Sequence, residues 1–229
     1  EKRSILLIMT NFAILQCLNK QCNFRCPADL KSCSSYCPIC GERMEIRVYV
    51  IDNGYAQFTK NTLSKLECAL DNVRSCYNVG SAFRSSCAFS INHLYLCGFT
   101  PTPAQRKVLK TSLGSERYVP WSYERNALTL IQQKREQRYS IYSIESSSTA
   151  ISITTPINDL TQKNILLIFG NENFGIDPEI RKLSDAVLQI PTTGNKPSLN
   201  IASAFAIAVF YFSTFFTKSA TISSTKRSF

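Results

Sequence analysis

The sequence predicts an α/β protein with a mainly parallel sheet, preceded by a small cysteine-rich domain. From Leu63 onwards, short apolar runs alternate with segments of helical character, a pattern typical of parallel sheets covered by helices. Two of these runs, Asn164–Phe169 and Ala186–Ile190, read as buried strands and lead into loops that carry Gly, Asn, Glu and Ser. Six of the ten cysteines lie between Cys17 and Cys40, so the N-terminal part is organised differently.

The chain of 229 residues is long enough to bury a substantial core, and it is strongly basic. It carries 26 Lys and Arg against 16 Asp and Glu, a formal net charge of +10. The expected partner of such a surface is a polyanion, either a nucleic acid or an anionic membrane. Residues 103–139 are strongly basic, whereas residues 140–185 are net acidic. We therefore expect the polyanion to be held mainly by segments outside 140–185.

Residues 1–60 are expected to form a zinc-ribbon-like domain. The sequence Cys37-Pro-Ile-Cys40-Gly places two thiolates three residues apart, on a turn that lets both reach one ion. Tetrahedral zinc needs a second pair, and clustered thiols suit metal binding in a reducing compartment. The preferred second pair is Cys17 with Cys22, and the possible substitutes are Cys26 and Cys33. The alternative is a set of buried thiols without metal.

Residues 61–216 are expected to form the α/β domain, and residues 217–229 a flexible tail rich in Ser and Thr. The sequence predicts helices over 78–89, 122–138 and 201–211, and strands over 93–98, 141–145, 164–169 and 186–190. The run Pro197–Thr217 has no charged residue and reaches membrane-spanning length. Its polar residues, Asn200 and Ser203 among them, favour a buried helix, so we expect no membrane partner.

Several chemistries are excluded by what the sequence lacks. No Gly-x-Gly-x-x-Gly follows a strand, so the dinucleotide-binding fingerprint is missing. Gly170 and Gly175 have the spacing of a phosphate loop, but Ile176 and Asp177 stand where Lys and Ser or Thr are required. The one histidine, His93, lies inside an apolar strand and is expected to be a core residue. A His-based triad or metallohydrolase is therefore excluded.

Three polar clusters remain, each at the end of an apolar element. Alone, each has a plain structural interpretation: a surface arginine, an ordinary strand-to-helix turn, and a helix N-cap at Ser198. The clusters are Asn78-Val-Gly80-Ser-Ala-Phe-Arg84, Phe169-Gly170-Asn171-Glu172-Asn173-Phe174-Gly175, and Ile190-Pro191 with Ser198-Leu199-Asn200.

Taken together, the order and spacing of these clusters and the apolar helix after them resemble the SpoU-type branch of the SPOUT superfamily, the RNA 2′-O-ribose methyltransferases. The resemblance covers about residues 65–212, with the clusters as motifs 1, 2 and 3. It implies a SPOUT-type trefoil-knotted parallel sheet with flanking helices, in which the knot forms the pocket for S-adenosyl-L-methionine. It also implies which residues bind that cofactor: Ile144, Gly170, Ile190, Ser198 and Leu199.

The reaction implied by the resemblance is methyl transfer to a ribose 2′-hydroxyl of tRNA or rRNA. Arg84 would then orient the phosphate and lower the pKa of the hydroxyl, because a guanidinium stays protonated and is a weak candidate for the base. The base itself is left open. The residues expected to position the substrate and the motif loops are Asn78, Glu172, Ser198 and Asn200, with Glu172 serving mainly to hold the fold.

The resemblance further implies a homodimer whose active site is built across the interface, and an RNA gripped by the zinc ribbon and the basic segment 103–139. The alternative is a non-catalytic RNA-binding or RNA-assembly protein that retains the knotted fold. Residue 1 is not Met, so a leader peptide could precede the chain. The expected location is accordingly the cytoplasm, or an organelle if such a leader exists.

Overall fold

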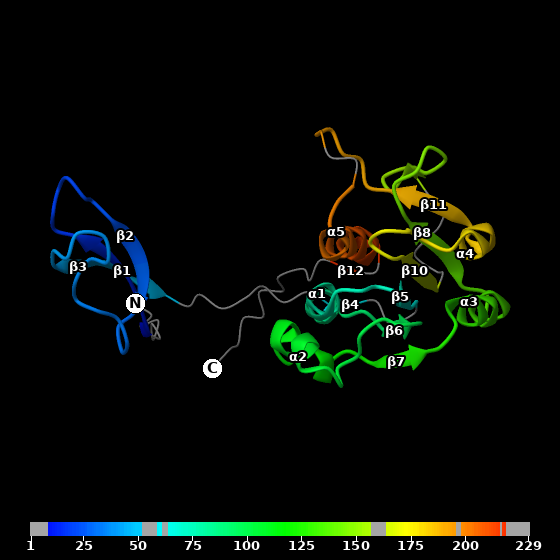
Figure 1. The fold of residues 1–229 in the computed structure, drawn as a ribbon, viewed down its shortest axis with the longest axis horizontal. Coiled ribbons are helices and arrows are strands. Elements are labelled where there is room, and N and C mark those ends of the chain that lie inside the picture. The colour runs from blue at the N-terminus through cyan, green and yellow to red at the C-terminus, as the bar shows by residue number, and fades with distance from the viewer. Residues whose placement is uncertain are drawn as a thin grey trace, which may run out of the picture. The chain divides into compact units, whose positions relative to one another are not determined.

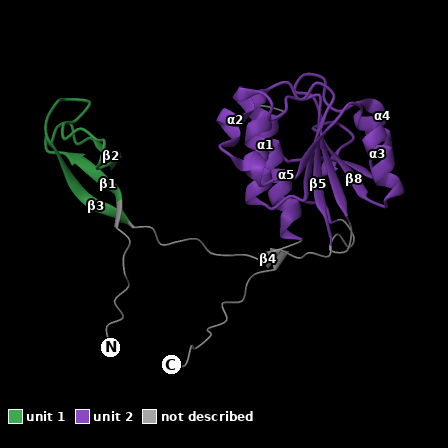
Figure 2. Cartoon of the chain, turned by 90° about the horizontal axis from the view of Figure 1, so that it is seen from below, with its two compact units in different colours: residues 1–57 green, residues 58–229 purple. Residues whose placement is uncertain are grey.

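A computed structural model describes residues 9–51, 59–60, 64–156, 164–195, 198–215 and 217–218. The chain forms two compact units, Glu1–Gln57 and Phe58–Phe229, which are drawn in different colours in Figure 2. Unit 1 is a three-stranded antiparallel sheet of order β2-β1-β3. Its strands are β1 (Met9–Cys17), β2 (Arg25–Asp29) and β3 (Met44–Ile51).

Unit 2 is built on a seven-stranded sheet of order β7-β6-β5-β10-β8-β11-β9, in which every neighbouring pair is parallel. This confirms the α/β fold class with a parallel sheet. Its strands are β5 (Leu66–Asp71), β6 (His93–Cys97), β7 (Trp121–Glu124), β8 (Ser140–Ile144), β9 (Ile151–Ser152), β10 (Ile165–Phe169) and β11 (Ala186–Gln189). Separately, β4 (Thr59–Lys60) pairs antiparallel with β12 (Thr217–Lys218), at the start of the segment expected to be a tail, and residues 219–229 lie outside the described part.

Helices cover both faces of this sheet (Figures 1 and 2). One layer holds α1 (Cys76–Ala88), α2 (Arg106–Ser112) and α5 (Ile201–Thr214), and the other holds α3 (Ala127–Glu136) and α4 (Pro178–Leu183). A short 3-10 helix, η1 (Ser115–Arg117), lies next to α1 and α2. The helix expected over 122–138 is wrong at its start, because residues 121–124 extend as edge strand β7 and Asn126 caps the helix only afterwards.

The core explains why α5 is so apolar. Phe205 and Phe212 are fully buried, and Phe205 packs on Phe169 of β10 with ring centroids 4.8 Å apart. The uncharged residues of α5 therefore cover the sheet and contact α1. Over the described residues, no helix is both long and apolar enough to cross a bilayer.

One basic residue of segment 103–139, Lys134, is buried. Lys134 of α3 lies 2.6 Å from Glu67 of β5, and both side chains are buried. The hydroxyls of Tyr95 and Tyr139 donate to the same carboxylate at 3.0 and 2.8 Å, so both of its oxygens accept hydrogen bonds. A buried pair satisfied in this way ties α3 to the sheet. Lys134 accordingly does not belong to the polyanion-facing surface.

Candidate functional site

The polar clusters meet at one edge of the sheet because the carboxyl ends of parallel strands point the same way. Ile144 ends β8, Gly170 follows β10, and Ile190 follows β11. The segment before α5 returns to the same edge with Ser198 and Leu199. These five residues all line one cavity of about 440 Å³, which we call the knot cavity. The five residues expected to bind the cofactor are thus brought together.

Gly170 is required by the close approach of its own loop. A Cβ at this position would lie 2.3 Å from the carbonyl oxygen of Gly175 and 2.6 Å from the amide nitrogen of Ile176. The loop folds back because Asn171 and Gly175 exchange two backbone hydrogen bonds of 2.9 Å each. The Asn171 side chain then donates to the carbonyl of Asn72 at 2.7 Å, which fixes the loop to the end of β5. The rim of the knot cavity is therefore backbone held in a fixed position.

Hydrogen bonds between side chains link all three motifs. Asn200 donates from Nδ2 to Oδ1 of Asn78 at 3.2 Å, and Asn78 donates from Nδ2 to Oε1 of Glu172 at 2.9 Å. Asn200 is also the N-cap of α5, accepting from the amide of Ala202 at 2.8 Å, so the cap is Asn200 rather than Ser198. Ser198 lines the knot cavity beside it.

Glu172 holds the start of α1. Its carboxylate accepts from the backbone amides of Arg74 at 2.8 Å and Ser75 at 3.1 Å, at the positive end of the helix dipole. Burial works to raise the pKa of Glu172, but the hydrogen bonds from Arg74, Asn78 and Ser75 outweigh it and lower the pKa. An ionised Glu172 therefore joins the motif 2 loop to α1.

Arg84 stands apart from the other candidate residues. It lies in α1 beyond Asn78, with its side chain exposed, and it does not line the knot cavity. Within the described part of the chain no hydrogen bond or ion pair of Arg84 is found. Asn78, Glu172, Ser198 and Asn200 thus share the edge that carries the five residues expected to bind the cofactor, whereas Arg84 faces outward.

Two further residues shape the knot cavity without having been predicted. Glu145 lines it, accepts from the amide of Ile176 at 3.1 Å and pairs with Arg181 at 3.4 Å. Asn171 also lines it and fixes the motif 2 loop. The position of Asn171 inside motif 2 was a usable signal, but nothing local marks Glu145. His93 is partly buried in β6, outside the cavity, where burial is the main cause that lowers its pKa.

A profile of the SpoU rRNA Methylase family matches residues 65–210, more than half of the chain. The chain belongs to the SpoU rRNA Methylase family. The matched range contains all three motifs and the elements β5 to α5, except for the last turns of that helix. The expected SPOUT-type membership is confirmed.

Curated relatives of this SpoU family member are similar over the same domain. A 23S rRNA (guanosine(2553)-2'-O)-methyltransferase, RlmP, of Bacillus subtilis is 27% identical over 143 residues, which cover 62% of this chain and 55% of the relative. An uncharacterized tRNA/rRNA methyltransferase of Borreliella burgdorferi is 30% identical over 141 residues, covering 62% and 60%. The chain spans about half the length of the curated relatives it matches.

Solved structures show the same fold. The SpoU methyltransferase AviRb from Streptomyces viridochromogenes, in complex with AdoMet, superposes with a TM-score of 0.59 at 19% identity, covering 77% of this chain and 70% of that one. The TrmH/SpoU tRNA modifying enzyme of A. aeolicus gives a TM-score of 0.59 at 21% identity, covering 68% and 77%. The parallel sheet with flanking helices is thus the SPOUT fold of the family. The threading of the chain into a knot agrees with this and stays a prediction.

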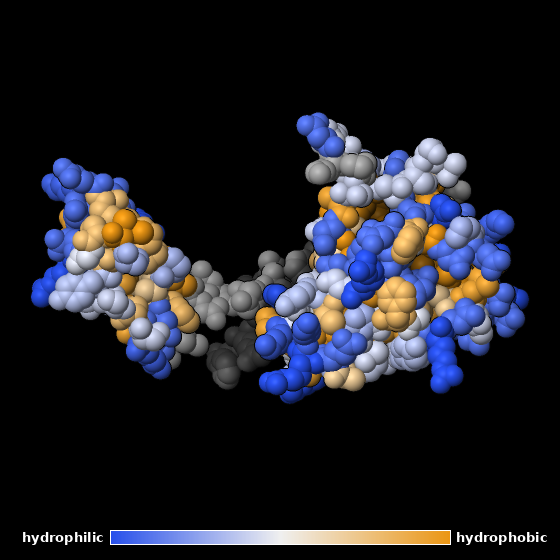
Figure 3. All heavy atoms as spheres, viewed as in Figure 1, coloured by the Kyte–Doolittle hydropathy of each residue, from blue (hydrophilic) through white to orange (hydrophobic). Residues whose placement is uncertain are grey.

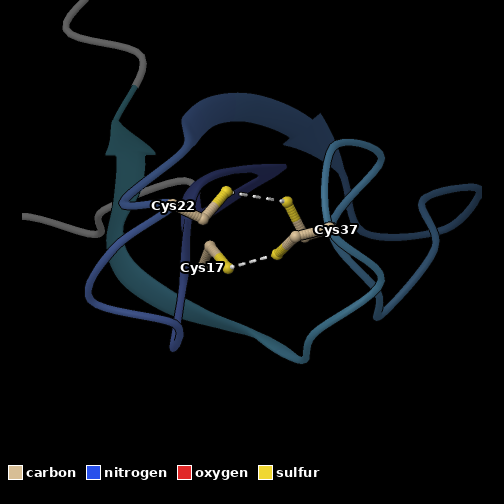
Figure 4. Close-up of side chains that lie close together, drawn as sticks. Cys17, Cys22 and Cys37 are labelled. Atoms are coloured by element: carbon tan, nitrogen blue, oxygen red, sulfur yellow. Dashed lines mark hydrogen bonds between the residues drawn. The ribbon is translucent and has the colours of Figure 1, made fainter.

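The second candidate centre lies in unit 1, outside the range that the SpoU family profile matches. The ligand atoms of Cys17, Cys22, Cys37 and Cys40 all lie within 4.8 Å of one another. Cys17 Sγ is 3.5 Å from Cys40 Sγ, and Cys22 Sγ is 3.8 Å from Cys37 Sγ (Figure 4). The amide of Ile39 donates to Cys37 Sγ at 3.4 Å, which favours the thiolate form. Four clustered thiols with such support fit a tetrahedral structural zinc ion.

Proposed function

We propose that this chain transfers a methyl group from S-adenosyl-L-methionine to a ribose 2′-hydroxyl of tRNA or rRNA. The observation that carries the proposal is the convergence on one sheet edge of the knot cavity and the hydrogen-bonded series Asn200–Asn78–Glu172. The names of the relatives, which include an rRNA 2'-O-methyltransferase, support the same reaction class.

The knot cavity fits the cofactor. Its volume of about 440 Å³ lies in the range of small-molecule sites. Ile144, Ile190 and Leu199 offer apolar walls for an adenine, and Gly170 lets the motif 2 loop fold closely against its own backbone at the rim. We propose that Gly170, Ile190 and Leu199 bind the cofactor through their backbone groups, beside Ile144 and Ser198. Bound S-adenosyl-L-methionine supplies an electrophilic methyl group on a positively charged sulfur.

The chain's own residues must align the hydroxyl with that methyl group and ease loss of its proton. Asn200 lines the cavity, and its hydrogen bond to Asn78 holds the two side chains in place. We assign them, with Ser198, to positioning the substrate, and Glu172 to holding the motif 2 loop against α1. Arg84 is assigned to orienting the RNA phosphate and lowering the pKa of the hydroxyl.

Because Arg84 lies outside its own chain's cavity, we propose that it serves the cavity of a second copy. The exposed face of α5 carries Ile207 and Phe210, which are 41% and 56% exposed, and α1 packs against α5. Tyr77 lies two turns before Arg84 on α1 and is 63% exposed. An apolar stripe next to an unpaired arginine suits a homodimer interface.

A mixed dimer tests this arrangement. An Arg84→Ala chain keeps its cavity, and a Gly170→Ala chain keeps its arginine, so a mixture should regain activity that neither variant has alone. Phe210→Asp should halve the mass measured by light scattering, whereas Lys182→Asp, a change at an exposed residue of α4 in the opposite helix layer, should leave the mass unchanged. If the mixed chains do not regain activity, Arg84 acts in the active site of its own chain.

RNA is proposed to be held by basic and aromatic side chains outside the cavity. Segment 103–139 exposes basic residues beside Tyr118, Trp121 and Tyr123, which are 79%, 37% and 48% exposed. Unit 1 also presents hydrophobic residues on the face seen in Figure 3, and it exposes Arg25 and Arg47. We propose that this zinc-ribbon unit, with Zn²⁺ on its four thiols, is an RNA-binding domain. Because phosphate contacts dominate such binding, RNA affinity should fall steeply as salt is raised.

The deciding experiment is incubation of the chain with radiolabelled S-adenosyl-L-methionine and total small and ribosomal RNA, followed by nuclease mapping. Label on the 2′-oxygen of a nucleotide is the expected result. The matched control is the Gly170→Ala chain, which should label nothing. If RNA is bound but no RNA is labelled, the chain is instead a non-catalytic RNA-binding member of the family.

A further inference from the structure

A second cavity of about 300 Å³ lies on the other side of the motif 2 loop. It shares Asn171, Gly175 and Ile176 with the knot cavity. Its remaining walls come from the ends of β5 and β6 and the start of α4, whereas the knot cavity lies over β8, β10 and β11. We call it the carboxylate cavity, after the two acids in its wall. Besides the three shared residues, it is lined by Asp71, Asn72, Phe99, Phe174, Asp177 and Pro178.

Two exposed phenyl rings line this cavity. Phe99 is 62% exposed and Phe174 is 88% exposed, although neither is needed to cover the core. Both are held through their backbones: the amide of Phe99 donates to Asn72 Oδ1 at 3.2 Å, and that of Phe174 donates to Asn171 Oδ1 at 3.1 Å. Aromatic rings presented on fixed backbone are the surface on which proteins stack unpaired bases.

The charged groups of the carboxylate cavity are acceptors. The side-chain oxygens of Asn72 and Asn171 are taken by backbone amides, and one hydrogen of each NH₂ group already donates, to Asp71 and to a carbonyl respectively. Asp71 is 5% exposed, and only its Oδ1 has a hydrogen-bond donor among the described residues, Asn72 at 2.9 Å. Asp177 uses Oδ1 to cap α4. Each carboxylate thus keeps acceptor capacity.

The negative charge and the acceptor groups of this cavity restrict which ligands it can bind. Two carboxylates repel a phosphate, so the cavity is not a grip for the RNA backbone. Guanine alone among the four bases presents two adjacent donors, N1–H and the 2-amino group, and can bond to both oxygens or to neighbouring carboxylates. Adenine and cytosine present a single amino donor on that edge, and uracil presents one N–H between two carbonyls.

We propose that the carboxylate cavity receives a guanine base of the RNA, which stacks on Phe174 and Phe99 and donates from N1 and the 2-amino group to Asp71. This rests on the proposed function, since it supplies the RNA with a base-reading subsite next to the methyl-transfer site. Because the two cavities share the motif 2 loop, a base held here keeps its ribose close to Glu172 and the rim residues.

The test uses the whole chain and two probes that differ by one amino group, guanosine and inosine 5′-monophosphate, titrated by calorimetry in magnesium-free buffer. Guanosine monophosphate should bind about tenfold more tightly than inosine monophosphate, and Asp71→Asn should remove that difference. Phe174→Ala should weaken both nucleotides about tenfold, as expected for a lost stacking partner. Glu179→Gln, a change at an exposed acid of α4, should alter neither.

Equal affinity for the two nucleotides, or Asp71→Asn binding like the unchanged chain, would overturn the inference. Binding that appears only when magnesium chloride is added would assign the acids to a cation instead and would overturn it equally. Unaltered S-adenosyl-L-methionine affinity in each variant shows that the fold is intact. The nucleotide titration does not need methyl transfer, so an inactive chain that still prefers guanosine monophosphate would refute only the proposed function.

Discussion

Asn78 of α1 donates a hydrogen bond of 2.9 Å to Glu172, 94 residues further along the chain. The same carboxylate accepts two backbone amides at the start of α1. The Glu172 side chain therefore joins motif 2 to motif 1 and anchors the start of the helix that carries Arg84.

Glu172→Ala should destabilise unit 2 by about 1–2 kcal/mol, because three donors lose an exposed but charged acceptor. Urea denaturation at neutral pH measures this. Glu136→Ala, which removes an exposed acid from the end of α3, should cost less than about 0.5 kcal/mol. The lowered pKa of Glu172 means that its contribution is present above the ordinary value of 4.5 and is lost as the pH falls through the folded-state pKa. Equal effects of the two substitutions would contradict the anchoring role.

Gly170→Ala should lower S-adenosyl-L-methionine affinity at least about tenfold and destabilise the chain by about 1–3 kcal/mol, because its Cβ would meet the backbone of Gly175. Gly194→Ala is the matched control, since nothing lies within 4 Å of a Cβ there. Calorimetry and urea denaturation of the two variants give the comparison. A Gly170→Ala chain that binds the cofactor normally would remove this loop from the cofactor site.

Arg84→Ala should reduce methyl transfer by about 100-fold or more while S-adenosyl-L-methionine affinity stays within about twofold, because the guanidinium acts on the RNA rather than on the cofactor. Label transfer and calorimetry separate the two effects. Lys182→Ala, which removes an exposed cation from α4, should change neither quantity. Loss of cofactor binding in Arg84→Ala would contradict the assignment.

Cys37→Ser should abolish zinc binding and unfold unit 1, since one of four ligands is lost and the small sheet has little core of its own. The unchanged chain should carry about one zinc ion, measured by elemental analysis. Cys33→Ser is the control: this exposed cysteine lies outside the cluster, so its zinc content should stay the same. Zinc retained by Cys37→Ser would show that another residue completes the site.

Asp71→Asn should stabilise unit 2 above pH 6. Burial, with a smaller contribution from the charge of Asp177, raises the pKa of Asp71 to about 6, against an ordinary value of 3.8. The raised pKa stabilises the folded state fully at pH values below 3.8, and this stabilisation is lost as the pH rises through about 6. Asparagine keeps the acceptor for Asn72 without the charge, so a gain of about 1–3 kcal/mol is expected at pH 7. Urea denaturation between pH 4 and pH 8 should show a flatter profile in the variant.

The motif residues and the main strands could be predicted from sequence because their signals are local. The strands around Leu167 and Leu188 are continuous apolar runs, and the loops after them carry the polar residues that line the knot cavity. The pairs Cys17 with Cys22 and Cys37 with Cys40 could likewise be chosen by spacing. Strand β5 was not predicted, and β7 begins a segment that was expected to be helical. Strand β9 was also missed, because two residues in a Ser- and Thr-rich connection carry no periodicity.

The sequence by itself determined the fold class, the loops that line the knot cavity and the thiol cluster, since each depends on residue types within a few positions. Only the tertiary structure decided that Glu172 anchors α1, that Arg84 faces away from its own cavity, and that Asp71 and Phe174 meet in a second cavity. These relationships join residues about 100 positions apart. They follow from the strand order, which sets β10 between β5 and β8, and no local pattern encodes that neighbourhood.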